Sequence, residues 1–427
     1  MGFLSRRVLT AALTANAIRT LPDPKIAAAS FLPGWFVGEL APQLLAATAA
    51  DTAIAVARGR AGRTGLVLAG ATAAGLGYLV WQGYRSHRTL DAALEEGLGA
   101  DYVERLDAPP SPGDYATPWR SLARPFHWSR PDVEVLKDIR YFDAGRRGLL
   151  DVSRPKGAVP RGAPVLLQVH GGGWVLGSKD QQGVPLSLHM AARGWVVVSI
   201  NYRLAPRDAF PAQIVDVKRA IAWVREHIAD YGGDPSYVVI TGGSAGGQLC
   251  ALAALTPSDP EYQPGFEDAD TSLAAAVPHY GVYDMAGVTG SRARPGCATP
   301  SLAPESCRRR TPPTPSCSRK PPRHPDHAGG ARLLRHPRCE RLAGRRRPGA
   351  SLRPPAARGV PQGRTPSCPA PSTPSDLFYS IRSVQVVTAV DRFLTWHWHT
   401  HRDAHRDAHP HQGLADARAG APEDVAS

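Results

Sequence analysis

The sequence predicts an α/β fold, with a mostly parallel sheet and helices on both faces, between residues 131 and 290. Two observations support this. Short apolar, β-branched runs alternate with longer segments whose apolar residues recur at helical spacing, and such alternation is typical of parallel sheets. A glycine-rich turn also stands directly between one of these runs and the helical segment that follows it.

The elements follow one another in a regular order. The runs APVLLQVH (163–170) and GWVVVSINYR (194–203) predict buried strands. Residues 210–235 have apolar side chains at helical spacing and end at a glycine pair, so they predict a helix. Residues 236–255 indicate a strand, a sharp turn and a helix, and residues 273–284 a further strand.

The sharp turn contains a candidate nucleophile, in the pattern Gly242-x-Ser244-x-Gly246. A serine on such a turn has a strained backbone, and only small neighbours let the turn close. The turn also places Ser244 at a helix N-terminus, where free N–H groups and the helix dipole favour a developing negative charge.

The segment HGGGW, His170 to Trp174, follows the first predicted strand. Consecutive glycines let backbone N–H groups point at a substrate oxygen. Together with the N–H of Ala245, these groups would form an oxyanion hole for a tetrahedral intermediate.

Five segments carry a resemblance to a known family: HGGGWVLGS, VVVSINYRLAP, FPAQIVDVKRAIAWV, GGDP and GGSAGG. They resemble the hormone-sensitive-lipase-like branch of the α/β-hydrolase superfamily, and the N-terminal part is similar to that of actinobacterial esterases of this branch. The resemblance implies a carboxylesterase or lipase of lipid metabolism that needs no cofactor and no metal. It implies Ser244 as nucleophile, with Gly171, Gly172 and Ala245 at the oxyanion hole. Gly243 departs from the family, which usually has Asp before the nucleophile.

Residues 291–375 break this pattern. They hold 18 Lys and Arg against 3 Asp and Glu, 18 of the 41 prolines and five of the six cysteines, but no Phe, Trp, Tyr or Ile. Such a segment cannot bury enough apolar surface to fold, so a disordered basic segment is predicted in place of the last strands. It has no recognisable nucleic-acid motif and no aromatic stacking residues, so we expect no nucleic-acid partner. The cysteine spacing indicates no zinc site.

The catalytic acid and base of the expected triad should follow the nucleophile and would fall in this segment. No residue of the chain can be assigned to either role. Asp284, at the end of the last predicted strand, is a weak candidate for the acid. His170 and His279 lie within the matching core, and a structural role is favoured for both. The histidine-rich tract 397–411 indicates a solvated tail rather than a metal site.

The composition break suggests that residues 291–375 are translated out of frame from a GC-rich gene. Codons for Pro371–Ser375 can be chosen so that another frame reads Gln-His-Ala-Phe, and the family keeps its catalytic histidine in such a segment. Codons for Cys339–Arg345 can be chosen to read Ala-Ser-Asp-Ser-Leu-Val, which is similar to the family's acid turn. Residues 376–400 again resemble the family, in its C-terminal helix, and residues 401–427 are predicted to be a disordered tail.

Residues 1–130 are predicted to be an N-terminal extension. Within it, residues 64–84 carry no charge and are long enough to span a bilayer. Three arginines precede this run, and Trp81 and Tyr84 stand at its far end, which suits a membrane helix with its N-terminal side in the cytoplasm. The alternative is a helix that packs on the globular domain. The expected location is therefore membrane-associated or cytoplasmic.

Two functions from different classes remain open. The first is an esterase that acts on a small-molecule ester or lipid through Ser244, impaired because the triad Asp and His are missing. The second is a catalytically inactive, membrane-associated binding protein of the same fold.

Overall fold

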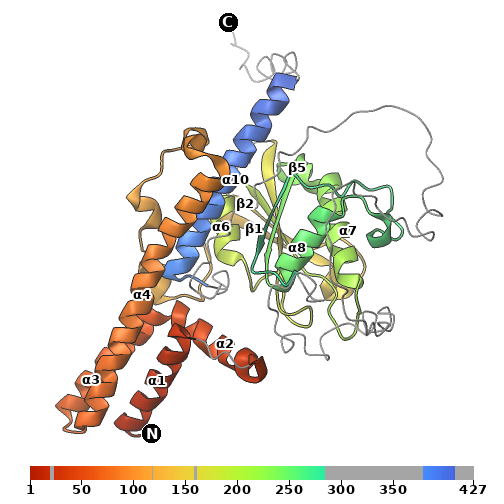
Figure 1. Cartoon of the computed structure of the whole chain (residues 1–427). Helices are drawn as coiled ribbons and strands as arrows, with labels where there is room; N and C mark the ends of the chain where they lie inside the picture. Colours follow the sequence, from red (N-terminus) through yellow and green to blue (C-terminus); the bar gives the residue numbers. More distant parts are fainter. Residues whose placement is uncertain (20–23, 118, 158–160, 284–377, 409–427) are drawn as a thin grey trace, which may run out of the picture. The chain divides into compact units, whose positions relative to one another are not determined.

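The computed structural model describes residues 1–19, 24–117, 119–157, 161–283 and 378–408 (Figure 1). Several predictions from the sequence lie outside these residues. They are the basic segment 291–375 with its five cysteines, the candidate acid Asp284, and the chain beyond residue 408.

A sheet of six strands, in the order β1-β2-β4-β3-β5-β6, lies at the centre of the described hydrolase core. The strands are β1 (Val133–Arg140), β2 (Leu149–Pro155), β3 (Ala163–Val169), β4 (Val196–Ile200), β5 (Gly233–Gly243) and β6 (Ala275–His279). β3 pairs in parallel with both β4 and β5, and β5 pairs in parallel with β6. β1 and β2 add two antiparallel pairings at one edge. The predicted mostly parallel α/β fold is confirmed.

Helices cover both faces of this sheet, as predicted. The described helices of the core are α6 (Val184–Ala192), α7 (Ala212–His227), α8 (Ala245–Leu255) and α10 (Ile381–Ala408), with short 3₁₀ turns at η3 (Gly145–Gly148), η4 (Ile228–Tyr231) and η5 (Pro260–Tyr262). Side chains of β3 alternate between two buried clusters. Val165 packs with α7 and α8 on one face, and Leu166 packs with α6 and α10 on the other.

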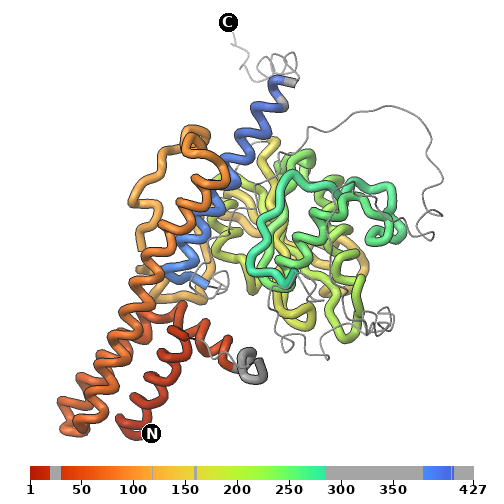
Figure 2. The backbone as a smooth tube through the Cα atoms, viewed as in Figure 1, coloured from red at the N-terminus to blue at the C-terminus, as the bar shows by residue number. Residues whose placement is uncertain are grey.

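The N-terminal extension is helical. It contains α1 (Phe3–Ile18), α2 (Pro24–Glu39), α3 (Ala41–Ala57) and α4 (Arg63–Leu98), followed by η1 (Ala100–Arg105), η2 (Pro112–Tyr115) and α5 (Trp119–Ala123). Helix α4 packs against α1 and α3 and runs along α10 (Figure 2). Small residues allow the close packing, because a Cβ on Gly65 would lie 2.6 Å from the Phe3 ring.

A buried arginine fastens the extension to the core. Arg392 of α10 donates to Asp91 of α4 at 2.8 Å and to Asp114 of η2 at 2.9 Å. Its guanidinium also lies over the ring of Tyr115, 4.9 Å from the centroid. These three contacts join segments that are about 300 residues apart in the sequence.

The histidine-rich tract differs from its prediction. Helix α10 continues to Ala408, beyond the expected end at residue 400. His397 forms a 2.7 Å hydrogen bond with the buried hydroxyl of Tyr237, and Nδ1 of His399 lies 2.8 Å from the carbonyl oxygen of Arg105. The interpretation as a solvated tail is therefore wrong for His397 and His399, which lie on α10 and contact other parts of the chain. Residues 402–404, 406 and 407 of the same helix are exposed.

Candidate active site

Ser244 is the single residue that connects the end of β5 at Gly243 to the start of α8 at Ala245. Its backbone has φ 56° and ψ −117°, a region that residues with a side chain rarely occupy. The N–H of Ser244 donates to the carbonyl oxygen of His279 at 3.0 Å, and its own carbonyl accepts from the N–H of Gln248 at 3.0 Å. These bonds tie the strained residue to β6 and to α8.

The glycines around Ser244 are required by close packing. A Cβ on Gly242 or on Gly246 would overlap the carbonyl oxygen of Val169, at the end of β3. A Cβ on Gly247 would lie 2.5 Å from the carbonyl oxygen of His279. The start of α8 therefore sits directly on the neighbouring strand ends, which holds the turn in its strained form.

The HGGGW loop lies against the same turn. A Cβ on Gly171 would be 2.6 Å from the carbonyl oxygen of Gly243 and 3.3 Å from Cβ of Ser244. Gly172 has φ +116°, which favours glycine. Nε1 of Trp174 donates to Oε1 of Gln248 at 3.2 Å, so the far end of the loop is attached to α8. The structure therefore brings the loop glycines and Ser244 together, as the sequence predicts.

The candidate oxyanion donors differ in their present hydrogen bonds. The N–H of Gly171 donates to Oε1 of Gln182 at 2.5 Å. Among the described residues, the N–H of Gly172 has no acceptor. The N–H of Ala245 belongs to the first turn of α8, where amides have no acceptor within the helix. The hydrogen bond of Gln182 to Gly171 was not predicted from the sequence, because no sequence motif indicates a hydrogen bond across a loop.

His170 supports the loop, as predicted. It is buried, its Nδ1 lies 2.7 Å from the carbonyl oxygen of Gly171, and its ring stacks on Tyr202 at 4.3 Å. Since a carbonyl only accepts, the proton must be on Nδ1. Burial lowers the pKa of His170 to about 4, so the ring is neutral at pH 7. Its Nε2 has no hydrogen-bond partner in the described part of the chain and does not reach Ser244.

His279 ends β6 directly beside Gly243. Its carbonyl oxygen holds the N–H of Ser244. Within the described ranges, Oγ of Ser244 makes no hydrogen bond to the imidazole of His279 or to any other histidine, and no group of three or more His, Cys, Asp or Glu could hold a metal ion. Cys250 is fully buried behind the turn, with its Sγ 3.0 Å from the position of a Cβ on Gly242.

Comparisons with known proteins identify the family to which this fold and site belong. A family model described as BD-FAE matches residues 150–303. The probable carboxylic ester hydrolase LipM of Mycobacterium tuberculosis (strain ATCC 25618 / H37Rv) is 43% identical over 299 residues, which cover 67% of each chain. The chain belongs to the hormone-sensitive-lipase-like branch of the α/β-hydrolase superfamily.

Other members of this branch from the same strain match shorter parts. The esterase LipQ is 49% identical over 209 residues, 48% of this chain and 50% of LipQ. The esterase LipC is 43% identical over 182 residues, 41% of this chain and 44% of LipC. The chain therefore spans about half the length of LipQ. The resemblance that the motifs predict is confirmed, and the family accounts for the turn at Ser244 and the glycine loop beside it.

Proposed function

We propose that this chain is a carboxylic-ester hydrolase with Ser244 as its nucleophile. The proposal depends on one observation above all, the strained backbone of Ser244 at the start of α8 with the Gly171 loop packed against it. Strain of this kind persists where the surrounding structure enforces it, and it lifts the hydroxyl out of the sheet toward a substrate. The relatives named as esterases support the same reaction class.

The reaction would proceed through an acyl-enzyme. Oγ of Ser244 attacks the acyl carbon of the ester while its proton passes to a base, and the carbonyl oxygen becomes an oxyanion. The N–H groups of Gly172 and Ala245 stabilise that charge, and Gly171 can join them once Gln182 releases it. Collapse of the intermediate expels the alcohol, and water then hydrolyses the acyl-serine to release the carboxylic acid.

The chain as written would be severely impaired. No described histidine lies in hydrogen-bond contact with Oγ of Ser244, so the proton has no acceptor of the usual kind in the described residues. Loss of a triad base typically lowers turnover by about 10⁴ to 10⁶, while oxyanion binding leaves about 10³ over water. The same observation favours the alternative, a catalytically inactive binding protein.

A fluorophosphonate probe separates these two functions, because it reports a reactive serine even when turnover is slow. We expect slow covalent labelling of the full chain, none in Ser244→Ala, and unchanged labelling in Ser236→Ala, which removes an exposed serine elsewhere in β5. Hydrolysis of p-nitrophenyl butyrate should be weak and should follow the same order. If neither reaction depends on Ser244, the esterase proposal is wrong and the binding protein is favoured.

We also propose that the helices of residues 1–130 associate with a membrane. In the described part of the chain, α4 is long and apolar enough to cross a bilayer, and the bent pair α2 and α3 would be a second candidate. Only 28% of the most apolar window of α4 is buried. The helices α1, α3 and α4 expose large apolar side chains: Leu4, Val8, Leu9, Ile54, Val56, Leu66 and Val67. Exposed apolar patches of this kind suit a lipid surface.

A further inference from the structure

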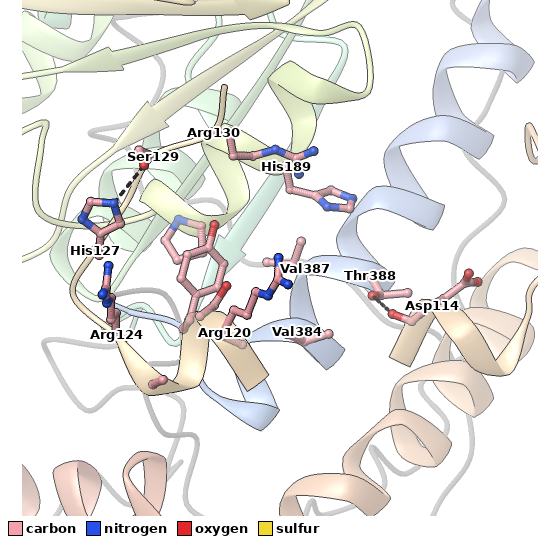
Figure 3. A pocket seen from close by; sticks show the side chains of 15 residues that line it. Asp114, Arg120, Arg124, His127, Ser129, Arg130, His189, Val384, Val387 and Thr388 are labelled. Atoms are coloured by element: carbon pink, nitrogen blue, oxygen red, sulfur yellow. Dashed lines mark hydrogen bonds between the residues drawn. The ribbon is translucent and has the colours of Figure 1, made fainter. Parts of the chain in front are cut away.

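A pocket of about 710 Å³ lies between α5 with its flanking residues, the start of α6 and the first turns of α10 (Figure 3). Its volume falls in the range of pockets that hold small organic ligands. Ser244 and the glycine loop do not line it. The pocket is therefore separate from the candidate active site, and the proposed ester hydrolysis does not explain it.

The charges around this pocket are unbalanced. Its titratable lining residues, apart from Tyr379, are Arg120, Arg124, Arg130, His127, His189 and Asp114. Three of these six have partners outside the pocket, and His127 bonds Ser129, which also lines the pocket, at 3.0 Å. The guanidinium of Arg130 forms an ion pair with Oδ2 of Asp132 at 2.7 Å, and Nε2 of His189 lies 2.9 Å from Oδ2 of Asp391. The single carboxylate, Asp114, is held by Arg392 at 2.9 Å. It is therefore not available to neutralise the remaining arginines.

Arg120 and Arg124 are the remaining arginines. Among the described residues, neither has an acidic partner. Both side chains line the pocket, and Arg120 extends toward Val384 and Val387 of α10 (Figure 3). Two guanidinium groups four residues apart present several fixed N–H donors, a geometry that suits the planar oxygens of a carboxylate or a phosphate.

The rest of the wall is largely apolar. Val384 and Val387 of α10, Ala123 of α5 and Pro185 of α6 line it. Tyr379 also lines the pocket, and burial raises the pKa of its hydroxyl, so this group stays protonated. An anion that filled this space would need an apolar body as well as a charged group.

We propose that this pocket binds an organic anion, a carboxylate or phosphate group carried on a short apolar chain. Arg120 and Arg124 bind the charged group, and the valines of α10 contact the chain. Two sources can supply such a ligand: a free carboxylic acid or a phospholipid headgroup. The proposal does not depend on the chemistry of Ser244, and a Ser244→Ala chain should bind the ligand equally well.

The test uses calorimetric titration of the full chain with octanoate, octyl phosphate and octyltrimethylammonium. The double variant Arg120→Gln/Arg124→Gln should lose about tenfold or more of its octanoate affinity, since charge-assisted hydrogen bonds are among the strong ones. The matched control is Arg140→Gln/Arg207→Gln, which removes the same charge from side chains that are 69% and 92% exposed and do not line the pocket. The control should bind like the unaltered chain.

Further titrations identify whether the ligand is a free acid or a phospholipid headgroup, and they can overturn the proposal. Tighter binding of octyl phosphate than of octanoate would indicate a phospholipid headgroup, and the reverse order would indicate a free acid. Affinity should fall as salt is added, because salt screens exposed charges. Equal binding of octyltrimethylammonium, equal losses in the two double variants, or no binding of either anion would overturn the proposal. Unchanged circular dichroism of both variants excludes unfolding as the cause.

Discussion

The N–H of Gly171 donates a 2.5 Å hydrogen bond to Oε1 of Gln182. Gly171 lies directly against Ser244, so this amide is one of the groups that an oxyanion would need. In the structure, a side chain of the protein already occupies it. A substrate oxygen can use this donor only after Gln182 moves. Gln182, which lies just before α6, therefore competes with the substrate oxygen for the N–H of Gly171.

Replacing Gln182 should therefore speed the reaction of Ser244. Gln182→Ala removes the competing acceptor, and one neutral hydrogen bond is worth about 1 kcal/mol, or about fivefold in rate. We expect fluorophosphonate labelling of Ser244 to accelerate by about that factor. The neighbouring exposed Gln181 offers a matched control, and Gln181→Ala should label at the original rate. Slower labelling of Gln182→Ala would mean that the side chain positions the loop rather than blocking it.

The close packing under the turn predicts that an added Cβ lowers the free energy of unfolding. Gly246→Ala adds a Cβ that overlaps the carbonyl oxygen of Val169, so backbone must shift. We expect the free energy of unfolding to fall by about 3 kcal/mol in urea titrations. Gly97→Ala in α4 is the control, because a Cβ there meets nothing within 4 Å. It should be neutral or stabilising by up to about 1 kcal/mol. Equal effects at the two glycines would contradict the packing argument.

Much of the fold follows from local pattern. The strands β3, β4 and β6 and the helices α7 and α8 fall inside the predicted segments, because buried runs and helical spacing are strong signals. β5 starts at Gly233, three residues before its predicted segment and within the stretch predicted to be helical. The strands β1 and β2 were not singled out, and β1 in particular has no fully buried residue. The bonds from Arg392 to Asp91 and from Gln182 to Gly171 could not be predicted, since no sequence pattern records contacts between distant segments or across a loop.

The site was only partly predictable for a different reason. The turn at Ser244 and the loop at Gly171 are built from adjacent residues, so motifs reveal them. A catalytic acid and base come from distant positions and are recognised by geometry. The family resemblance predicts both positions within residues 291–375, which lie outside the described residues.

Acid should destabilise the fold through His170. Burial lowers the folded pKa of this ring from 6.5 to about 4. Between these values the unfolded chain binds a proton that the folded chain does not, so stability is lost as pH falls from about 6.5 to about 4. The full loss would be about 3 kcal/mol. In urea titrations at several pH values, His170→Asn should flatten this slope, whereas His127→Asn, an exposed control, should not. An unchanged slope in His170→Asn would assign the acid sensitivity to other groups.

Membrane association should depend on the exposed side of α4. Leu66 and Val67 are 39% and 71% exposed near its start. A lysine at the centre of a membrane helix costs about 2.5 to 3.5 kcal/mol, and less near its ends. Leu66→Lys/Val67→Lys should therefore move the chain from the membrane fraction toward the soluble fraction. The control Leu176→Lys/Leu255→Lys adds the same charge to exposed residues of the hydrolase core and should leave the distribution unchanged. Recovery of the unaltered chain in the soluble fraction without detergent would contradict the proposal.

The last prediction concerns the reading frame of residues 291–375. Their composition, with 18 Lys and Arg and no Phe, Trp, Tyr or Ile, differs from that of the flanking segments that resemble the family. We expect the coding DNA to hold an alternative frame that reads His-Ala-Phe near codon 372, with compensating shifts at the two ends. A gene repaired to that frame should hydrolyse p-nitrophenyl butyrate about 10⁴-fold faster or more, since the triad base would be restored. Ser244→Ala in the repaired chain should abolish this gain, and Ser236→Ala should leave it intact. Two results would count against the prediction: codons without such a frame, or a chain as written that already turns over esters as fast as its repaired form. In the second case the base must already be present in the chain, and His279 beside the turn would be the first residue to replace.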